Sequence, residues 1–490
     1  MNGLGDMELP PGWAWSILEE VLAAEPRAIT DGPFGSNLKS VHYTDKGARV
    51  LRLQNVGDGV FRDERAYISL EHFETLNKHE AEEGDLIIAS LGEVLPRAAV
   101  VPKLGGPAIV KADVIRARIH KLVSTKWILY ALLSPQIRSY TASRIKGVGR
   151  PRLGLGEIRG LPIPLPPLNE QLRIVECLEE HLSRVDSAEA DLGGSLAHIP
   201  RLVDGMRNSA TRYVSPTARP HVSWPLGKLS DVLDRIEAGK SFQCEPRPAA
   251  EAEWGVIKVS AMTWGEFRAE EQKAVPSSKP VDSRHEIQPG DVLVSRANTA
   301  AHVGAPVLVQ TCRPRLLLSD KSLRLVPRAG VDKRWLLHVL SSPFVRNQIS
   351  RKATGTKDSM RNISQRDLLD INIPMPPHET QKRIGDSLDI EVDRIGMLGT
   401  QLRLAQSQAR RLRLALLGQA ISGRLVTHEA TDEPASVLLD RIRSERMGQG
   451  GTTKRVTRRS RATSTAKDVP PPPTSSIPTP TTAVQQELPL

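Results

Sequence analysis

The chain is poor in the residues that build disulfide frameworks and metal centres. Its three cysteines, Cys177, Cys244 and Cys312, lie far apart and show no CxxC spacing. An odd number of scattered cysteines favours neither a disulfide scaffold nor a zinc site. We therefore expect ordinary reduced thiols and no bound metal.

Long hydrophobic runs are missing as well. No stretch of the sequence approaches the roughly 18 apolar residues of a membrane span. The polar segment Met1–Glu8 lacks the apolar core of a signal peptide. The sequence therefore predicts a cytoplasmic protein without a membrane segment.

Sequence motifs for catalysis are also missing. Pro166-Pro167 precedes Leu168, and Pro376-Pro377 precedes His378, so neither proline pair has the flanking residues with which adenine methyltransferases grip a base. There is no phosphate-binding Gly-x-x-x-x-Gly-Lys loop, and the zincin pattern of two histidines on one helix does not occur. We expect no catalytic residue and no cofactor held by this chain.

Positive charge is in excess, but it is concentrated near one end. The net charge is +11 and the pI is near 9.6, which favours a polyanionic partner. Residues 441–468 hold nine lysines and arginines against two acidic residues. Residues 447–490 are rich in Pro, Thr and Ser and predict a disordered basic tail. Such a tail either holds nucleic acid non-specifically or is a solvated extension.

What the chain does contain is an internal repeat. The sequence LPIPLPPLNEQ at 161–171 returns as INIPMPPHETQ at 371–381. Other matched segments follow in the same order in both halves: Trp15-Ser-Ile-Leu with Trp224-Pro-Leu-Gly, Val50-Leu-Arg-Leu with Val256-Ile-Lys-Val, Gly84-Asp-Leu-Ile with Gly290-Asp-Val-Leu, and Trp127 with Trp335. A repeated order of this kind indicates a duplicated unit. We expect two domains, residues 12–165 and 222–375.

Each predicted domain combines short strands with a helix. Apolar and β-branched runs bounded by Gly, Pro and Asp predict strands at 49–54, 85–89, 98–101 and 108–119, and at 256–260, 291–295, 306–310 and 316–326. Helices are expected at about 125–134 and 332–340. Each domain therefore has the pattern of an α+β fold with a mostly mixed sheet.

A helical period follows each proline motif. The second copy has a heptad seam at Ile384, Leu388, Ile395, Leu398, Leu402, Ala405, Ala409, Leu412 and Leu416, and the first has one at Ile174, Leu178, Val185, Ala188, Leu192, Ser195, Ile199, Leu202 and Met206. Either helix alone could pack on its own domain, but two seams in one register favour mutual pairing. The regions are 166–213 and 376–425. We expect Gly193-Gly194 and Pro200 to bend or interrupt the first helix.

The motifs in this order resemble the specificity subunit of a Type I restriction-modification system. The resemblance covers about residues 12–425 and is carried by Asp31–Lys39, Val50–Asn55, Gly84–Ile87, Ser295–Asn298 and both proline motifs. It implies two target recognition domains, each reading one half of a bipartite asymmetric site in double-stranded DNA, joined by an antiparallel helical spacer. It also implies two methyltransferase subunits, which carry S-adenosylmethionine, and restriction subunits, which use ATP and Mg²⁺.

Two basic, glycine-containing loops lie at equivalent points before the proline motifs. Their candidates for phosphate contact are Arg144, Lys146, Arg150 and Arg152 in the first loop, and Arg351, Lys352, Lys357, Arg361 and Asn362 in the second. The alternative is a solubilising surface loop. Candidates for contacts with bases are Ser36, Asn37, Gln54, Asn55, Lys240, Ser241, Arg296 and Asn298. Asn55 and Asn298 could equally cap turns.

Two other functions remain open. One is a helical scaffold that binds only protein, whose recognition domains have decayed. The other is a self-contained restriction enzyme, which the missing methyltransferase motif opposes. DNA affinity that falls as salt rises would separate a DNA-binding subunit from a protein scaffold.

Overall fold

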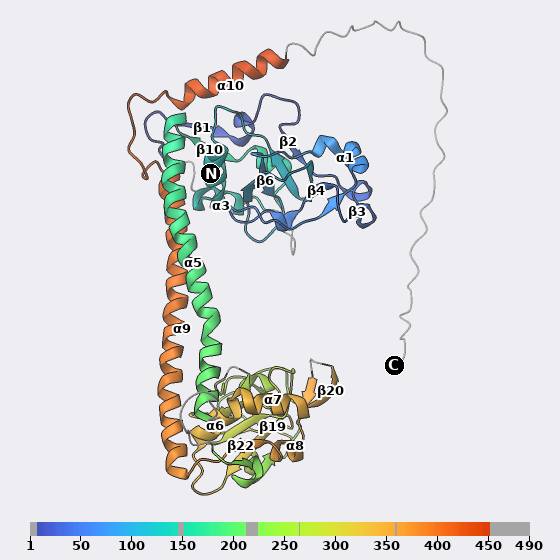
Figure 1. The fold of residues 1–490 in the computed structure, drawn as a ribbon, viewed down its shortest axis with the longest axis vertical. Helices are drawn as coiled ribbons and strands as arrows, with labels where there is room; N and C mark the ends of the chain where they lie inside the picture. Colours follow the sequence, from blue (N-terminus) through green and yellow to red (C-terminus); the bar gives the residue numbers. More distant parts are fainter. Residues whose placement is uncertain (1–6, 146–150, 212–223, 264, 358–359, 451–490) are drawn as a thin grey trace, which may run out of the picture. The chain divides into compact units, whose positions relative to one another are not determined.

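The computed structural model describes residues 7–145, 151–211, 224–263, 265–357 and 360–450. The chain forms two compact units. One comprises residues 12–125, 144–168 and the chain from 431 onward, and the other comprises residues 1–11, 126–143 and 169–430. Both contain helices and strands (Figure 1), so the predicted α+β class is confirmed.

Two small sheets form the core of the first domain, whose bounds of 12–165 stay a prediction because residues 126–143 cluster with the other unit. Their strands are β2 Ile29–Asp31, β3 Tyr43–Thr44, β4 Ala48–Leu51, β5 Tyr67–Ile68, β6 Leu86–Ala89, β7 Arg97–Val100, β8 Ala108–Val110 and β9 Val114–Ala117. One sheet has the order β2-β9-β6-β7 and is antiparallel, and the other has the order β3-β5-β4-β8 with a parallel β4–β8 pair. The helices are α1 Leu70–Leu76, α2 Thr125–Leu133, α3 Pro135–Ala142 and α4 Leu155–Arg159.

The second domain repeats this arrangement. Its strands are β12 Leu233–Ala238, β13 Gly255–Ile257, β14 Gln272–Ala274, β15 Val292–Ser295, β16 Ala297–Asn298, β17 Pro306–Leu308, β18 Leu316–Leu317, β19 Ser322–Pro327, β20 Thr354–Lys357 and β21 Met360–Asn362. The order β12-β19-β15-β17 is antiparallel, β14-β13-β18 has a parallel β13–β18 pair, and β16-β21-β20 is a separate sheet. The helices are α6 Lys333–Ser341, α7 Pro343–Lys352 and α8 Gln365–Leu369.

The sheets differ in one respect from the sequence expectation. A mostly mixed sheet was predicted, but each domain has one four-stranded antiparallel sheet and one sheet that contains a single parallel pair, and the second domain adds the antiparallel sheet β16-β21-β20. Strand patterns cannot separate these cases, because a short buried apolar run looks the same in either pairing.

The repeated Gly-Asp sequence forms the same turn in both domains. Gly84 and Gly290 both have a φ of +88°, a conformation that glycine adopts without strain. The side chain of Asp85 accepts a hydrogen bond of 2.9 Å from a backbone N–H three residues earlier, and Asp291 does the same at 2.9 Å. The motif is therefore a turn that starts a central strand.

The same two aspartates also hold an arginine from the neighbouring strand region. Asp85 accepts from Nε of Arg118 at 2.9 Å, and Asp291 accepts from Nε of Arg324 at 2.9 Å. The Asp85 side chain is 3% exposed and the Arg324 side chain 11%. Because a buried charge is costly without a partner, each pair ties its Gly-Asp turn to the sheet.

A second glycine pair allows two backbones to approach closely. A Cβ atom on Gly32 would lie 2.1 Å from the carbonyl carbon of Lys111, and one on Gly239 would lie 2.3 Å from the carbonyl carbon of Leu318. Real side chains cannot occupy that space. Gly32 therefore lets the segment after β2 cross the end of the parallel pair β4–β8. Gly239 does the same for the segment after β12 at the pair β13–β18.

The proline motifs close each domain before a long helix starts. In the first copy, β10 Pro162–Leu165 pairs antiparallel with β1 Ala14–Ile17. In the second, β22 Asn372–Pro374 pairs antiparallel with β11 Leu226–Lys228. Proline lacks an N–H and suits such an edge position.

The glutamine that ends each proline motif is buried at the start of the long helix. Gln171 is 0% exposed and Gln381 is 6% exposed. Gln381 donates to the carbonyl of Pro376 at 3.0 Å and accepts from the backbone N–H of Asp332 at 3.3 Å. These bonds fix the start of α9, His378–Ile421, to the second domain.

Two long helices lie side by side within one unit (Figure 1). They are α5 Leu168–Thr211 and α9 His378–Ile421, each of 44 residues. Asp186 of α5 pairs with Arg413 of α9, and Gly399 of α9 faces Ile199 of α5. Residue numbers rise on one helix as they fall on the other, so the predicted antiparallel coiled coil is confirmed.

The expected interruption of the first long helix does not occur. Gly193, Gly194 and Pro200 all lie inside α5, which continues to Thr211, and Figure 1 shows it curving along α9. Pro200 is exposed, so its ring lies away from the seam. Pairing with α9 outweighs the local preference of these residues, as tertiary packing often does.

The seam follows the predicted period, with alternate positions displaced by one residue. Leu202, Leu398 and Leu412 were expected inside, but they are 52%, 46% and 52% exposed. Gly399, one residue after the expected Leu398, is buried instead. Most of the expected positions are buried or half-buried: Ile174, Leu178, Val185, Leu192, Ile199 and Met206 in α5, with Ile384, Leu388, Ile395, Leu402, Ala405, Ala409 and Leu416 in α9.

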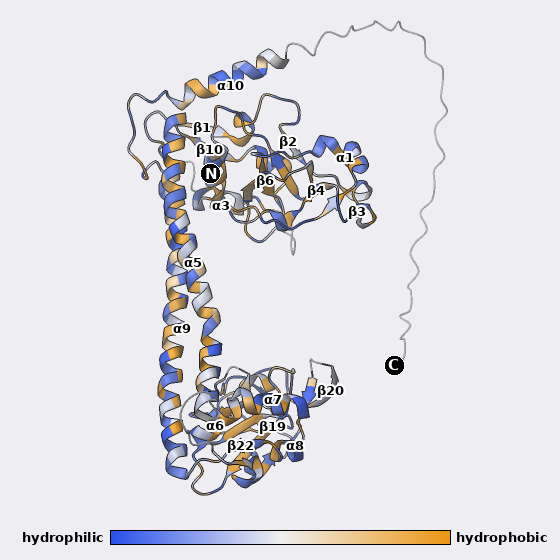
Figure 2. Cartoon of the chain, in the orientation of Figure 1, coloured by the Kyte–Doolittle hydropathy of each residue, from blue (hydrophilic) through white to orange (hydrophobic). Residues whose placement is uncertain are grey.

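The displaced seam leaves an apolar stripe on the outer face of α9. Ile390, Met397 and Leu404 follow one another at seven-residue steps and are 54%, 61% and 57% exposed. Figure 2 shows hydrophobic residues along the length of both long helices. Seven-residue spacing places these three side chains on one line of the helix surface.

Helix α10, Ala435–Gly450, lies after the helix pair and was not predicted from the sequence. Leu438, Leu439 and Ile442 are buried, and Arg443 pairs with Glu20 of the first domain at 3.0 Å. The tail was expected to be disordered from residue 447, but 447–450 belong to this helix. The rest of the predicted tail, 451–490, lies outside the described residues.

Candidate nucleic-acid interface

Three segments meet in the second domain at what we call the second junction, defined by Arg296, Lys321 and Asn362. The backbone N–H of Arg296 donates to the carbonyl of Lys321 at 2.8 Å, and the carbonyl of Arg296 accepts from Ile363 at 3.0 Å. Strand β16 then pairs with β21, with Asn298 opposite Arg361. Four predicted contact residues, Arg296, Asn298, Arg361 and Asn362, are thus brought together.

The first domain has the same arrangement, here called the first junction and defined by Ser90, Asp113 and Arg152. The backbone N–H of Ser90 donates to the carbonyl of Asp113 at 2.9 Å, and the carbonyl of Ser90 accepts from Leu153 at 2.8 Å. Leu91 forms an isolated bridge with Arg152. The backbone hydrogen bonds of the two junctions correspond one to one, although their side chains differ.

The second basic loop forms a β-hairpin, β20–β21, at the edge of the second junction. Gly355 has a φ of +138°, and a Cβ there would lie 2.5 Å from the carbonyl oxygen of Met360. Arg361 donates to the carbonyl of Gly355 at 3.0 Å. Met360 is 52% exposed near the tip. The hairpin therefore presents polar and apolar side chains on a narrow projection.

The predicted phosphate contacts have different surroundings. Lys352 pairs with Asp370 at 2.6 Å, and hydrogen bonds from Lys228 and Lys352 lower the pKa of Asp370 to about 2. Arg144 and Arg351 are exposed. Lys146 and Arg150 lie outside the described residues, and for Lys357 only the backbone is described.

Arg152 is engaged inside the first domain. Its guanidinium pairs with Asp113 at 3.0 Å and lies 5.4 Å from the centre of the Phe34 ring. The Arg152 side chain is 47% exposed and Phe34 is 44% exposed. An arginine stacked on an exposed aromatic ring still offers an accessible edge to a ligand.

Two of the predicted base contacts are used to form turns. Asn55 is 0% exposed; its amide donates to the carbonyls of Arg62 and Glu64 at 2.8 Å each. Asn298 accepts from the backbone N–H of Thr299 at 2.8 Å. Asn55 is therefore a structural residue, which corrects its assignment as a base contact, and Asn298 takes the turn-capping role.

Five other predicted base contacts are exposed or half-buried. Asn37, Gln54, Lys240 and Ser241 are exposed, and Arg296 is half-buried. Ser36 lies in a short 3₁₀ helix, Gly35–Asn37. Each of these segments follows or precedes a core strand, so a rigid scaffold carries them.

A pocket beside the second junction collects residues that the sequence reasoning missed. Its volume is about 340 Å³, and its lining includes Lys240, Lys258, Lys273, Lys321 and Asp320. Of the residues that line the pocket, Lys240 and Ser241 were predicted. Lys258 could have been found, because it occupies the place of Arg52 in the matched strand motif. Lys273 and Lys321 lie in segments where the two halves share no motif.

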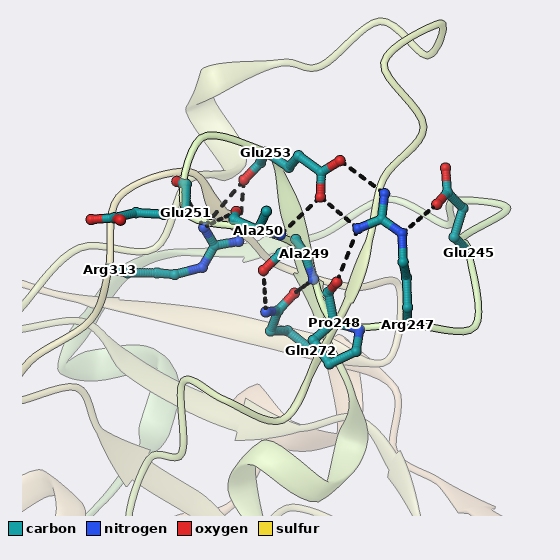
Figure 3. A network of polar contacts seen from close by, with 9 residues as sticks. All are labelled: Glu245, Arg247, Pro248, Ala249, Ala250, Glu251, Glu253, Gln272 and Arg313. Atoms are coloured by element: carbon teal, nitrogen blue, oxygen red, sulfur yellow. Dashed lines mark hydrogen bonds and ion pairs between the residues drawn. The ribbon is translucent and has the colours of Figure 1, made fainter.

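Near the pocket, the arginines are already paired within the domain (Figure 3). Arg247 donates to Glu253 at 2.6 and 2.8 Å and to Glu245 at 2.8 Å. Arg313 donates to the carbonyl of Glu253 at 3.2 Å, and a hydrogen bond from Arg247 lowers the pKa of Glu253 to about 2. Buried Gln272 accepts a loop N–H at 3.0 Å. These contacts fix the loop 245–253.

Neither a metal centre nor a membrane helix is found within the described ranges. Among those residues, no three His, Cys, Asp or Glu side chains converge as metal ligands would. Within the same part of the chain, no helix has the length and apolar character needed to cross a membrane.

The comparisons with known proteins agree with the fold. Residues 58–191 match the family described as the Type I restriction modification DNA specificity domain. The chain is 23% identical to the EcoEI specificity subunit of Escherichia coli, over 85% of this chain and 83% of that protein. It is also 23% identical to the EcoKI specificity subunit of Escherichia coli K12, over 68% of this chain and 74% of that protein.

Two solved structures share the architecture. One, from a study of complex assembly and conformational transition of the type I R-M system, aligns with a TM-score of 0.65 at 22% identity, covering 85% of this chain and 99% of that chain. The HsdS subunit from Thermoanaerobacter tengcongensis aligns with a TM-score of 0.51 at 22% identity, covering 86% and 99%. The predicted resemblance to specificity subunits of Type I restriction-modification systems is therefore confirmed.

Proposed function

We propose that this chain is the non-catalytic subunit that gives a Type I restriction-modification complex its DNA specificity. Each domain recognises one half of a bipartite, asymmetric site in double-stranded DNA. The repeated junction carries this proposal: its backbone hydrogen bonds recur in both domains, while Ser90, Asp113 and Arg152 are replaced by Arg296, Lys321 and Asn362. One scaffold with two sets of side chains suits two different half-sites.

The two predicted basic loops supply the phosphate contacts in this proposal. Cations from residues 144–152 and 351–362 position each domain on the DNA backbone. Polar residues recognise the bases: the exposed Asn37 and Gln54 in the first domain, and the exposed Lys240 and Ser241 with the half-buried Arg296 in the second. Arginine suits guanine, and Asn or Gln suits adenine, by geometry in the major groove.

The long helices set the distance between half-sites in this proposal. Each has 44 residues, so each is about 66 Å long at 1.5 Å per residue. That length exceeds one DNA turn of about 34–36 Å. A paired register then makes the gap between half-sites a fixed property of the chain.

The same helices bind the partner subunits, which hold all the cofactors. Two methyltransferase subunits carry S-adenosylmethionine, and restriction subunits use ATP and Mg²⁺. The stripe of Ile390, Met397 and Leu404 supports this docking, because its seven-residue spacing matches the contact line of another helix.

Salt dependence of DNA binding tests the proposal. The logarithm of the affinity of the full chain for duplex DNA should fall steeply and linearly with the logarithm of the salt concentration, because counterions are released when phosphate contacts form. The Met397→Glu variant should lose the methyltransferase subunit in co-purification, whereas Gln401→Glu, a charge on a nearby exposed polar position, should retain it. A wild-type chain that binds partner but no DNA would support the protein-only scaffold instead.

A further inference from the structure

The pocket beside the second junction gathers positive charge from four separate segments. Lys240 follows β12, Lys258 follows β13, Lys273 lies in β14, and Lys321 precedes β19. Asp320 is the one acidic residue in the lining. Segments distant in the sequence thus converge on one concave surface with a formal excess of positive charge.

Part of this charge is compensated and part is not. Lys258 pairs with Glu271 at 3.4 Å, and Lys240 lies 3.8 Å from Asp282. Across the ranges that the structure describes, neither Lys273 nor Lys321 has an ion pair, and both are exposed. Like charges held together without counter-charges oppose folding, so an anionic ligand would relieve this repulsion.

The first domain shows the opposite charge at the equivalent place. The carbonyl of Lys321 accepts the backbone N–H of Arg296, as the carbonyl of Asp113 accepts that of Ser90. Lys321 therefore occupies the position of Asp113, and Asp113 is paired with Arg152. The repeat has kept the backbone hydrogen bond but has reversed the charge of the side chain at this position.

We propose that this pocket binds one backbone phosphate of the DNA, with Lys273 and Lys321 as its principal cations. The proposal rests on the proposed function and deepens it by placing a phosphate contact away from the predicted basic loops. Ammonium groups suit this role as point charges. The exposed side chain of Ser241 and the Lys321 backbone link the pocket to the junction, so one DNA strand can contact both.

The test compares variants of the full chain in titrations against duplex DNA over a range of salt. Lys273→Ala combined with Lys321→Ala removes the two unpaired cations, and Lys279→Ala removes an exposed lysine of the same domain outside the pocket. Loss of one phosphate contact lowers the logarithmic salt slope by about 0.9. At 0.1 M salt this corresponds to roughly eightfold weaker binding, equal for all sequences. The Lys279→Ala variant should match the wild type.

Several results would overturn the proposal. An unchanged slope in the double variant, with circular dichroism showing a native fold, would exclude a phosphate contact here. Weaker binding to one sequence only would assign the pocket to a base. The Lys321→Asp variant carries the residue that the first domain has at this position. It should weaken DNA binding more than the double alanine variant does, and binding equal to or tighter than that of the double variant would contradict the assignment. A wild-type chain without any DNA affinity would overturn the proposed function itself.

Discussion

The two junctions have the same backbone and different chemistry. In the first, Asp113 pairs with Arg152, which stacks on Phe34. In the second, Lys321 takes the place of the aspartate and has neighbouring lysines in a pocket. Duplication has therefore preserved what the sheets require and has left the surface side chains to diverge. The elements that repeat support the fold, and the elements that differ are the candidates for specificity.

Replacement of the whole first domain should have the largest effect. If residues 12–160 are exchanged for those of another specificity subunit, only one half of the methylated DNA motif should change. The second half and the gap should stay, because the second domain and both long helices are untouched. Sequencing of methylated sites would measure this. A change in both halves would show that the domains do not recognise DNA independently.

Insertion of one heptad into α9 alone should alter or abolish the gap between half-sites. The two helices share one register, so seven extra residues on one side displace the contacts that bring Gly399 to Ile199. The gap in the methylated motif is the readout. If the gap is unaltered, the helix pair does not set the spacing.

The two close-approach glycines should be equally intolerant of substitution. Gly32→Ala and Gly239→Ala each place a Cβ within about 2.3 Å of backbone, as the 2.1 and 2.3 Å separations show. We expect losses of at least about 3 kcal/mol in each domain, seen as a lower thermal midpoint. Gly156→Ala is the control, since its Cβ meets nothing within 4 Å. If one of the two glycines tolerated alanine, the domains would not be equivalent there.

The displaced seam can be tested on adjacent residues of α9. A Cβ on Gly399 would lie 3.0 Å from Cδ1 of Ile199, so Gly399→Leu should destabilise the helix pair by about 1–3 kcal/mol. Leu398→Ala should change stability by less than about 0.5 kcal/mol, because Leu398 is 46% exposed. Thermal unfolding measures both. The reverse ranking would restore the seam that the sequence predicts.

The smallest expected effect concerns the charge at the first junction. Asp113→Lys introduces the residue type of the second junction and removes the partner of Arg152. Binding to all DNA sequences should become a few-fold tighter at low salt. The slope of log affinity against log salt should become steeper by about one unit at most. Titrations at several salt concentrations give both values. Unchanged binding would indicate that Asp113 does not face DNA.

The sequence predicted the repeated core well because its signals are local. The structure contains the strands predicted around Val50, Ile87, Val256 and Leu293, although β4 and β13 each end three residues before the predicted ends at 54 and 260. The helix pair followed from two matched heptad patterns. These features depend on periodicity and on turn residues, which a sequence displays directly.

Features that depend on packing were not predictable in this way. The choice of Gly399 over Leu398 for the seam requires knowledge of how closely the two helices approach. The burial of Asn55 depends on carbonyls seven and nine residues away. Helix α10 is stabilised by contacts with residues near the start of the chain, such as Glu20.

The pocket was missed for a similar reason. Its four lysines come from segments between residues 240 and 321, and only the folded domain brings them together. The two basic, glycine-containing loops could be predicted because their charged residues are adjacent in the sequence. Convergent charges from separate strands leave no such local pattern.

The most direct test of the central claim is the pattern of DNA methylation in cells that express this chain with its methyltransferase partner, compared with cells that lack the chain. Two recognition domains on a fixed spacer predict one new methylated motif, with two different half-sites around a constant gap. A motif with a single undivided site, or no new methylation despite a stable complex, would contradict the account.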